Sequence, residues 1–181
     1  MRLVPAEQRQ AFLRLARQAL RDYLETGNVL EPADPSSPPG TVCGLFVTLR
    51  QQGELRGCIG VLGTGEPPER DVVRCSISAA TQDPRFPAVT LADLAELKLE
   101  ISVLSTLLPV AAPEEILVGR DGLQIEKEGR RGLLLPQVPV EQGWDRVQFL
   151  QELCKKAGLP RGAWRTGAIL HRFTAQVFQE C

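Results

Sequence analysis

The chain repeats one pattern of secondary structure, a hairpin followed by a helix and then a strand. Apolar residues at helical spacing predict the helices, and alternation of apolar and polar residues around two-residue turn signals predicts the strands. A further helix is predicted at 5–26, ahead of both copies. The predicted elements are hairpins at 41–61 and 123–135, helices at 68–81 and 144–157, and strands at 97–104 and 168–178.

This order predicts an α+β fold with a mainly antiparallel sheet and an internal duplication of a ββαβ unit, plus the extra N-terminal helix. A length of 181 residues fits one domain over 1–181, which can divide into two subdomains at 1–108 and 109–181. The strand within 41–50 is apolar on both faces, which is typical of a central strand. The Pro- and Ser-rich stretch at 28–40 predicts a loop.

Charge and hydropathy disfavour several classes of protein. The formal net charge is −1 and the pI is near 5.9, so a general nucleic-acid binder, which needs a basic excess, is disfavoured. An apolar run of about 20 residues, as a membrane span requires, does not occur, and no membrane partner is expected. The first residues lack the apolar core of a signal peptide, which predicts a cytoplasmic protein.

The cysteines do not form a metal or disulfide pattern. There are five of them, an odd number, and none forms a CxxC pair. The one histidine, His171, leaves too few ligands at the right spacing for zinc. We therefore predict neither a metal site nor a bound cofactor.

The segment Leu55–Gly60 (LRGCIG) is the strongest candidate for a site. Gly57 and Gly60 flank Cys58 inside a predicted strand, where glycine usually marks a bulge or a close backbone approach. Cys58 could be a nucleophile activated by Arg56 and by exposed backbone N–H groups, or a small buried thiol. Pairing around the Gln52-Gly53 turn predicts that Cys58 lies opposite Phe46 or Val47, without fixing its face.

Two arginines could bind an anionic substrate beside this thiol. Arg56 precedes Cys58, and Arg85 lies in a proline-locked loop that also carries Phe86. The alternative is local neutralisation, of Arg56 by Glu54 or Glu100 and of Arg85 by Asp83. Phe86 would then serve only to fill the core beside a helix-terminating turn.

Four other polar or aromatic positions have both a functional and a structural interpretation. Glu100 and Ser102 share the polar face of a predicted strand, where they could line a cleft with Glu100 as acid or base, or simply face solvent. Trp144 could stack on a planar ligand, although packing at a helix start explains it equally, with the adjacent Asp145 favourable at the positive end of the helix. His171 is more simply explained as a hydrogen-bonded strand residue than as a base.

Six ordered blocks resemble the AMMECR family, named for the AMME-syndrome chromosomal region, over roughly residues 8–178. The resemblance implies an α+β fold with an internal duplication. It also implies a link to a Memo-like protein and a radical-SAM enzyme, as protein A of the AmmeMemoRadiSam system, without a settled activity. Relative to the family, the chain has a long Pro/Ser segment at 31–40, and we expect no fused Memo-like domain. The blocks are 45–49 (LFVTL), 55–60 (LRGCIG), 83–87 (DPRFP), 100–104 (EISVL), 134–138 (LLPQV) and 143–145 (GWD).

Two functions follow from these residues. The first is an enzyme or enzyme component that binds a small anionic or nucleotide-like substrate near 55–60 and 83–86, with Cys58 as nucleophile and Memo-like and radical-SAM partners. The second is a non-catalytic adaptor or binding module that recognises a protein or nucleic acid, with Cys58 structural. The sequence names neither a substrate nor a reaction.

Overall fold

A computed structural model describes residues 4–32, 42–63 and 65–181, so most of the predicted loop at 28–40 lies outside the described residues. The chain forms two compact units, one of Met1–Ser105 with Gln176–Cys181 and one of Thr106–Ala175. The last residues therefore belong to the first unit, whereas a division at 1–108 and 109–181 would assign them to the second.

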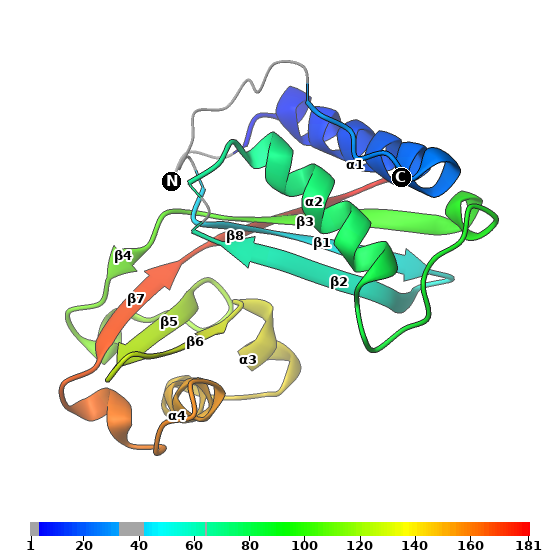
Figure 1. The fold of residues 1–181 in the computed structure, drawn as a ribbon. Helices are drawn as coiled ribbons and strands as arrows, with labels where there is room; N and C mark the ends of the chain where they lie inside the picture. The colour runs from blue at the N-terminus through cyan, green and yellow to red at the C-terminus, as the bar shows by residue number, and fades with distance from the viewer. Residues whose placement is uncertain (1–3, 33–41, 64) are drawn as a thin grey trace. The chain divides into compact units, whose positions relative to one another are not determined.

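The first unit contains a four-stranded antiparallel sheet in the order β2-β1-β3-β8 (Figure 1). As the apolar pattern predicts, β1 is central, paired with β2 on one side and β3 on the other. The strands are β1 (Gly44–Gln51), β2 (Glu54–Leu62), β3 (Leu97–Leu104) and β8 (Ala175–Gln179).

Helices α1 (Ala6–Thr26) and α2 (Pro68–Thr81) lie on one face of this sheet (Figure 1). Proline at the first position of α2 suits a helix start, because its missing N–H has no intrahelical partner there. Gly27 ends α1 in the left-handed conformation that favours glycine. The core between helices and sheet includes apolar side chains of both helices and alternate residues of β1 and β3: Leu45, Val47, Leu49, Leu99 and Ile101.

The second unit contains the other sheet, in the order β4-β7-β5-β6. Its core packs α4 against the sheet, with Phe149, Leu150 and Leu153 fully buried beside Leu123 and Ile125. Its elements are β4 (Leu108–Pro109), β5 (Gly122–Lys127), β6 (Arg130–Leu134), β7 (Ile169–Phe173), α3 (Gln137–Glu141) and α4 (Arg146–Lys156). Short 3₁₀ turns occur at Asp93–Ala95, Pro113–Glu115 and Ala163–Arg165.

The predicted duplication is visible in the topology, and the α+β class is confirmed. The strand order β2-β1-β3 of the first unit recurs as β6-β5-β7 in the second. Each hairpin turns through a residue pair with positive φ, first Gln52-Gly53 and then Glu128-Gly129, as a two-residue turn requires. A Cβ on Gly57 of β2 would meet the backbone of α2, and one on Gly132 of β6 would meet the backbone of Ala157, which caps the end of α4. The same close strand–helix approach is thus built twice.

The structure divides the final predicted strand, 168–178, into two strands. It breaks at Thr174, and β7 pairs with β5 in the second unit whereas β8 joins the first sheet beside β3. Strand β4 makes the opposite change of sheet. It follows β3 of the first sheet in the chain, but it pairs with β7 of the second sheet. The alternation of apolar residues is continuous through 169–177, so the sequence pattern does not indicate that the chain changes sheet there.

A bulge at Arg56 sets the face on which Cys58 lies. The hairpin pairs Gln51 with Glu54, and the register then shifts by one residue between Leu49 and Arg50. Cys58 consequently lies opposite Thr48, and the expectation of Phe46 or Val47 was wrong because it allowed for no bulge at this point. Since Val47 faces the core, the shift moves the thiol to the face opposite α1 and α2.

Candidate functional site

Cys58 lies in a row of three polar side chains that crosses the first sheet. Thr48 on β1 is paired with Cys58 on one side and with Glu100 of β3 on the other. The Thr48 hydroxyl donates a hydrogen bond to the sulfur, with 3.3 Å between Oγ1 and Sγ. Thr48 is buried, whereas Cys58 and Glu100 are half-buried. The thiol therefore combines a polar neighbour with access to solvent.

The two glycines of the motif have different packing partners on opposite faces of β2. A Cβ on Gly57 would overlap the carbonyl oxygen of Ala79, where α2 crosses the strand. A Cβ on Gly60 would overlap the ring of Phe46, which lies across that position on the other face. Close backbone approach and aromatic cover thus account for both glycines.

The loop after α2 holds Cys58 by its backbone. The Cys58 N–H donates to Oδ2 of Asp83 at 2.9 Å, and the Cys58 carbonyl accepts from the Arg85 guanidinium at 3.2 Å. Arg85 also donates two side-chain hydrogen bonds to Asp83, at 2.9 and 2.7 Å. Because β2 is an edge strand, the Asp83–Arg85 pair satisfies groups that a further strand would otherwise pair.

Asp83 is an ionised carboxylate inside the protein. It is 5% exposed. The hydrogen bonds from the Arg85 side chain hold the pKa of Asp83 well below its ordinary range, and the backbone N–H groups of Cys58 and Arg85 add to this against the opposing effect of burial. The pair is therefore a charged, hydrogen-bonded support beneath the edge of the sheet.

The structure keeps Arg56 and Arg85 in separate interactions. Arg56 donates to the carbonyl oxygens of Pro87 at 2.5 Å and Ala88 at 3.3 Å. Arg85 neutralises Asp83, the alternative considered above, and its guanidinium lies 5.4 Å from the centre of the Phe86 ring. Phe86 is only half-buried, so it does not fill the core. Carbonyl partners orient Arg56 but do not neutralise its charge.

Glu100 and Ser102 have different environments on the same strand. Glu100 forms an ion pair with Arg50, with 3.7 Å between Oε2 and Nε. Ser102 is 4% exposed and lies opposite Phe46. The polar side of β3 therefore contains one charged residue within reach of solvent and one buried hydroxyl.

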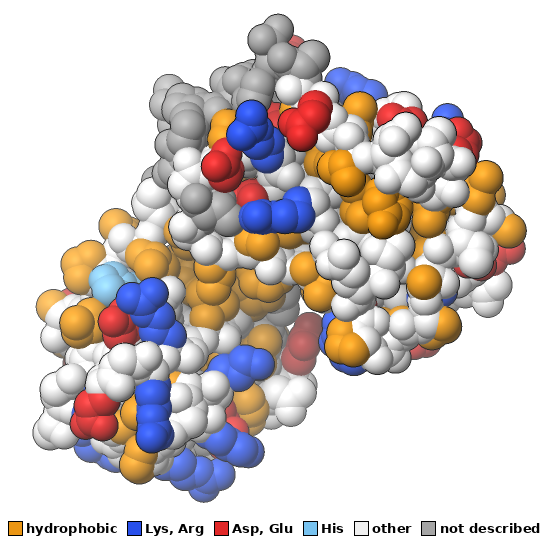
Figure 2. Space-filling view, in the orientation of Figure 1, with side chains coloured by type: hydrophobic (Ala, Val, Ile, Leu, Met, Phe, Trp, Pro, Cys, Tyr) orange, Lys and Arg blue, Asp and Glu red, His pale blue; other side chains and the backbone are white. Residues whose placement is uncertain are grey.

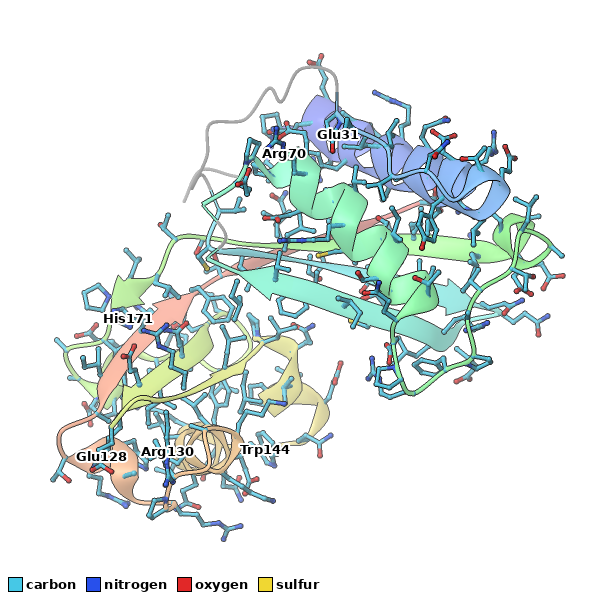
Figure 3. All side chains as sticks on the ribbon, in the orientation of Figure 1. Glu31, Arg70, Glu128, Arg130, Trp144 and His171 are labelled. Atoms are coloured by element: carbon cyan, nitrogen blue, oxygen red, sulfur yellow. The ribbon has the colours of Figure 1, made fainter. Side chains whose placement is uncertain are left out.

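The other candidates lie in the second unit. His171 is on β7, opposite Pro109 and Gln124 (Figure 3). Its ring reaches the surface (pale blue in Figure 2), while its Nδ1 is buried with no hydrogen-bond partner among the described residues. Trp144 packs against the second core just ahead of α4 (Figure 3), and Asp145 caps that helix in a capping box with Gln148.

Three of the remaining cysteines are held as neutral thiols. Burial raises the pKa of Cys43 to about 11 and that of Cys75 to about 12, with the charge of Asp71 adding to the effect at Cys75. Burial also raises the pKa of Cys154. A neutral thiol is a poor nucleophile, so these three are suited to packing.

Three cavities lie away from the thiol. In the first unit, one of about 470 Å³ lies between α1 and the end of β8, and one of about 420 Å³ lies between α1 and α2. In the second unit, one of about 560 Å³ lies beside the start of α4. None of the three is lined by Cys58, Arg56 or Arg85.

The described residues contain no cluster of three or more His, Cys, Asp or Glu side chains that could hold a metal ion. Within 4–32, 42–63 and 65–181, no helix is both long and apolar enough to cross a membrane.

Sequence reasoning missed two members of the site. Thr48 was not singled out, although turn arithmetic with one bulged residue would have placed it opposite Cys58. Asp83 was considered only as a partner of Arg85, and nothing in the local pattern indicates that its carboxylate reaches the Cys58 N–H. Thr48 was missed because the strand register was predicted without a bulge. The role of Asp83 was missed because it depends on a long-range contact.

Known proteins match this chain along nearly its whole length. The family model AMMECR1 matches residues 13–178. A protein of Thermococcus gammatolerans is 44% identical over 181 residues, which cover 93% of this chain and 88% of the relative. A protein of Methanopyrus kandleri is 43% identical over 184 residues, with 96% and 89% covered.

A solved structure has the same fold. The crystal structure of an uncharacterized protein from Pyrococcus horikoshii superimposes with a TM-score of 0.84 at 40% sequence identity, covering 98% of this chain and 93% of that one. The descriptions of these relatives assign them no activity.

Proposed function

This chain belongs to the AMMECR1 family, and we propose that it is an enzyme or enzyme component in which Cys58 is the nucleophile toward a small anionic or nucleotide-like substrate. The observation that carries the proposal is the fixed position of this thiol. Both backbone groups of Cys58 are held by the Asp83–Arg85 pair, and a hydroxyl donates to its sulfur on a solvent-accessible face.

This environment suits a reactive thiol. The thiolate is the nucleophilic form of cysteine, and a donor directed at the sulfur stabilises that form. Fixing the backbone reduces the motion that must be lost before a productive encounter. By contrast, the pKa of Cys75 is raised to about 12 by burial, so Cys75 stays neutral.

The proton of the thiol requires an acceptor, and we assign this role to Glu100. Glu100 is the next residue beyond Thr48 in the row, on the strand at the other side of β1 from Cys58. In this step the Thr48 hydroxyl accepts the thiol proton and passes its own proton to Glu100, which leaves Thr48 donating to the thiolate. The sulfur forms a bond to an electrophilic atom of the substrate, while the bond from that atom to its leaving group breaks and the electron pair departs with that group. The ion pair with Arg50 holds Glu100 near this position.

Arg56 is the residue best suited to an anionic group of the substrate. Its hydrogen bonds go to neutral carbonyl oxygens, whereas the charge of Arg85 is matched by Asp83. The charge of Arg56 contributes to lowering the pKa of Asp93, after the larger effect of hydrogen bonds from Thr90. In the proposal, Gly60 lies beneath the Phe46 ring on the face of the thiol, and Gly57 lies against α2 on the other face. Phe86 and Ser102 complete the surroundings.

Coupling to other proteins is part of this proposal. The family resemblance supports a Memo-like protein and a radical-SAM enzyme as partners.

A non-catalytic binding module is the second candidate. The observation that favours it is that every distinctive residue of the motif has a packing or backbone contact. Gly57 accommodates α2, Gly60 accommodates Phe46, and Arg56 holds the loop at 87–88. On this account the thiol fills space, and its removal affects only stability.

Protection from alkylation distinguishes the two functions. The folded chain is treated with iodoacetamide in the presence of a panel of small carboxylates, phosphates and nucleotides, and the modified cysteine is identified by mass spectrometry. The enzyme account predicts that at least one compound slows labelling of Cys58 but not of the exposed Cys181, and that Arg56→Gln abolishes this protection. Labelling of Cys58 that no compound slows, together with a Cys58→Ala variant altered only in stability, would favour the binding module.

A further inference from the structure

The groove between α1 and β8 carries an uncompensated positive charge. Arg14, Arg17 and Arg21 line one side of this cavity of about 470 Å³, spaced so that they share one face of the helix. Arg17 is neutralised by Glu180 and also donates to the carbonyl oxygens of Leu94 and Leu97. Arg14 and Arg21 are exposed, and no acidic side chain among the described residues forms an ion pair with either. Two cations therefore remain available to a ligand.

The other side of the groove is an open sheet edge. β8 is the last strand in the order β2-β1-β3-β8. The backbone N–H of Glu180 donates to Leu99 of β3, so by alternation the backbone groups of Gln179 and Val177 face away from the sheet. Val4 contacts the side chain of Gln176 at the start of β8, which leaves the stretch from Val177 onward without a neighbouring strand among the described residues.

β8 also lacks the features by which sheet edges usually avoid new partners. Its residues, Ala175–Gln179, include no charge and no proline, and Val177 is 48% exposed. The opposite edge differs, because the Asp83–Arg85 pair occupies the outward backbone groups of β2 at Cys58. Only one edge of this sheet is thus blocked at the positions described.

We propose that the α1–β8 groove binds an extended acidic segment of a partner protein, which adds a strand to β8. The outward N–H and C=O groups of Val177 and Gln179 pair with the backbone of the added segment. Its alternate side chains face the helix, as Phe178 of β8 and Glu180 just after β8 do, and acidic residues at those positions meet Arg14 and Arg21. A second copy of this chain fits less well, because its own arginine stripe would be brought toward this one.

The test is fluorescence anisotropy of the whole chain with a labelled peptide in which glutamate and valine alternate, beside a peptide with lysine in place of glutamate. We expect the acidic peptide to bind, the lysine peptide not to bind, and added salt to weaken the complex. The double variant Arg14→Glu/Arg21→Glu should weaken binding about tenfold or more. Arg70→Glu, which reverses an exposed charge on α2, is the matched control and should bind as the wild type does.

Val177→Pro tests the backbone part of the proposal. It removes an outward N–H while leaving the pairing toward β3, and Val177→Thr is the control that keeps the N–H. We expect Val177→Pro to lose peptide binding with a cooperative unfolding transition retained. Failure of the acidic peptide to bind, or equal binding by the arginine and proline variants, overturns the proposal. A dimer of this chain that Val177→Pro dissociates also overturns it, since the edge would then be occupied by a second copy.

Discussion

Asp83 accepts a hydrogen bond from the backbone N–H of Cys58, with 2.9 Å between Oδ2 and N. The two residues are joined a second time through Arg85, which binds the Asp83 carboxylate and the Cys58 carbonyl. A charged turn therefore substitutes for a neighbouring strand at one residue of the edge strand β2. The position of the thiol therefore depends on these contacts with Asp83 and Arg85 as much as on the strand pairing within the sheet.

Asp83→Asn should lower the free energy of unfolding by about 1–3 kcal/mol, because a buried carboxylate with a charged partner loses its charge. Urea unfolding at pH 7 measures the change. Asp22→Asn, on the surface of α1, is a control for loss of a carboxylate and should change the stability little. An Asp83→Asn variant as stable as the wild type would mean that the pair does not support β2.

The same pair predicts a pH dependence. Because the folded-state pKa of Asp83 is depressed, its contribution is complete above the unfolded value of about 3.9 and declines as the pH falls below it. The difference in stability between wild type and Asp83→Asn should therefore be constant from pH 7 down to about pH 5 and smaller at about pH 3. A difference that grows on acidification would contradict this assignment.

The glycine positions predict unequal costs of substitution. Gly57→Ala meets the backbone of α2, which cannot move without displacing the helix, so we expect a loss of about 3 kcal/mol or more in unfolding free energy. The methyl group of Gly60→Ala meets the ring of Phe46, a side chain that can shift without moving the backbone. We therefore expect a smaller loss of about 1–3 kcal/mol in unfolding free energy. Phe46→Leu should recover part of the Gly60→Ala loss and none of the Gly57→Ala loss in thermal unfolding.

Thr48 should control the reactivity of Cys58. Thr48→Val keeps the shape but removes the donor to the sulfur, and we expect alkylation of Cys58 to slow by about five- to tenfold. Thr48→Ser keeps a hydroxyl and is the matched control, with a rate close to that of the wild type. Equal rates in the valine and serine variants would show that the hydroxyl has no role at the sulfur.

The buried thiols predict a loss of stability in alkali. Because burial raises the folded-state pKa of Cys75 to about 12, its contribution is complete below the unfolded value of about 8.5 and is lost as the pH rises above it. Between pH 8 and about pH 10.5, the wild type should lose more unfolding free energy than Cys75→Ala does. Cys181→Ala, at an exposed position, should lose as much as the wild type.

Much of the fold was predictable because its signals are local. The boundaries of α2 and β3 were predicted to the residue, since proline, helical spacing and strand alternation each act within a few residues. The two-residue turns at Gln52-Gly53 and Glu128-Gly129 also follow from local conformational preference. From these elements the duplicated ββαβ order could be inferred before any contact was known.

The features that were not predicted depend on tertiary structure. The bulge at Arg56 changes the face of the sheet on which Cys58 lies. The apolar pattern of the sequence does not indicate this shift of one residue in strand register. The break at Thr174 assigns β7 and β8 to different sheets although the alternation continues through it. The short helix α3 contains Pro139, which disfavours a helix prediction there. Each depends on which segments meet, which one sequence does not specify.

The candidate site was predictable in part for the same reason. Cys58, Arg56 and Arg85 were identified by residue type and local context, and the structure places all three at or beside β2. Thr48 and the carboxylate of Asp83 complete the surroundings of Cys58 through contacts across 10 and 25 residues of chain. Residue type suggested the chemistry, and the long-range contacts supply the geometry.

The most direct test of the central claim is the rate at which iodoacetamide modifies each cysteine of the folded wild-type chain at neutral pH, with the sites assigned by mass spectrometry. The account predicts that Cys58 is modified in the folded state, well before Cys75 and Cys154, which should react only on unfolding. If Cys58 instead reacts only when urea unfolds the chain, together with Cys75, it is a structural thiol and the proposed nucleophile is contradicted.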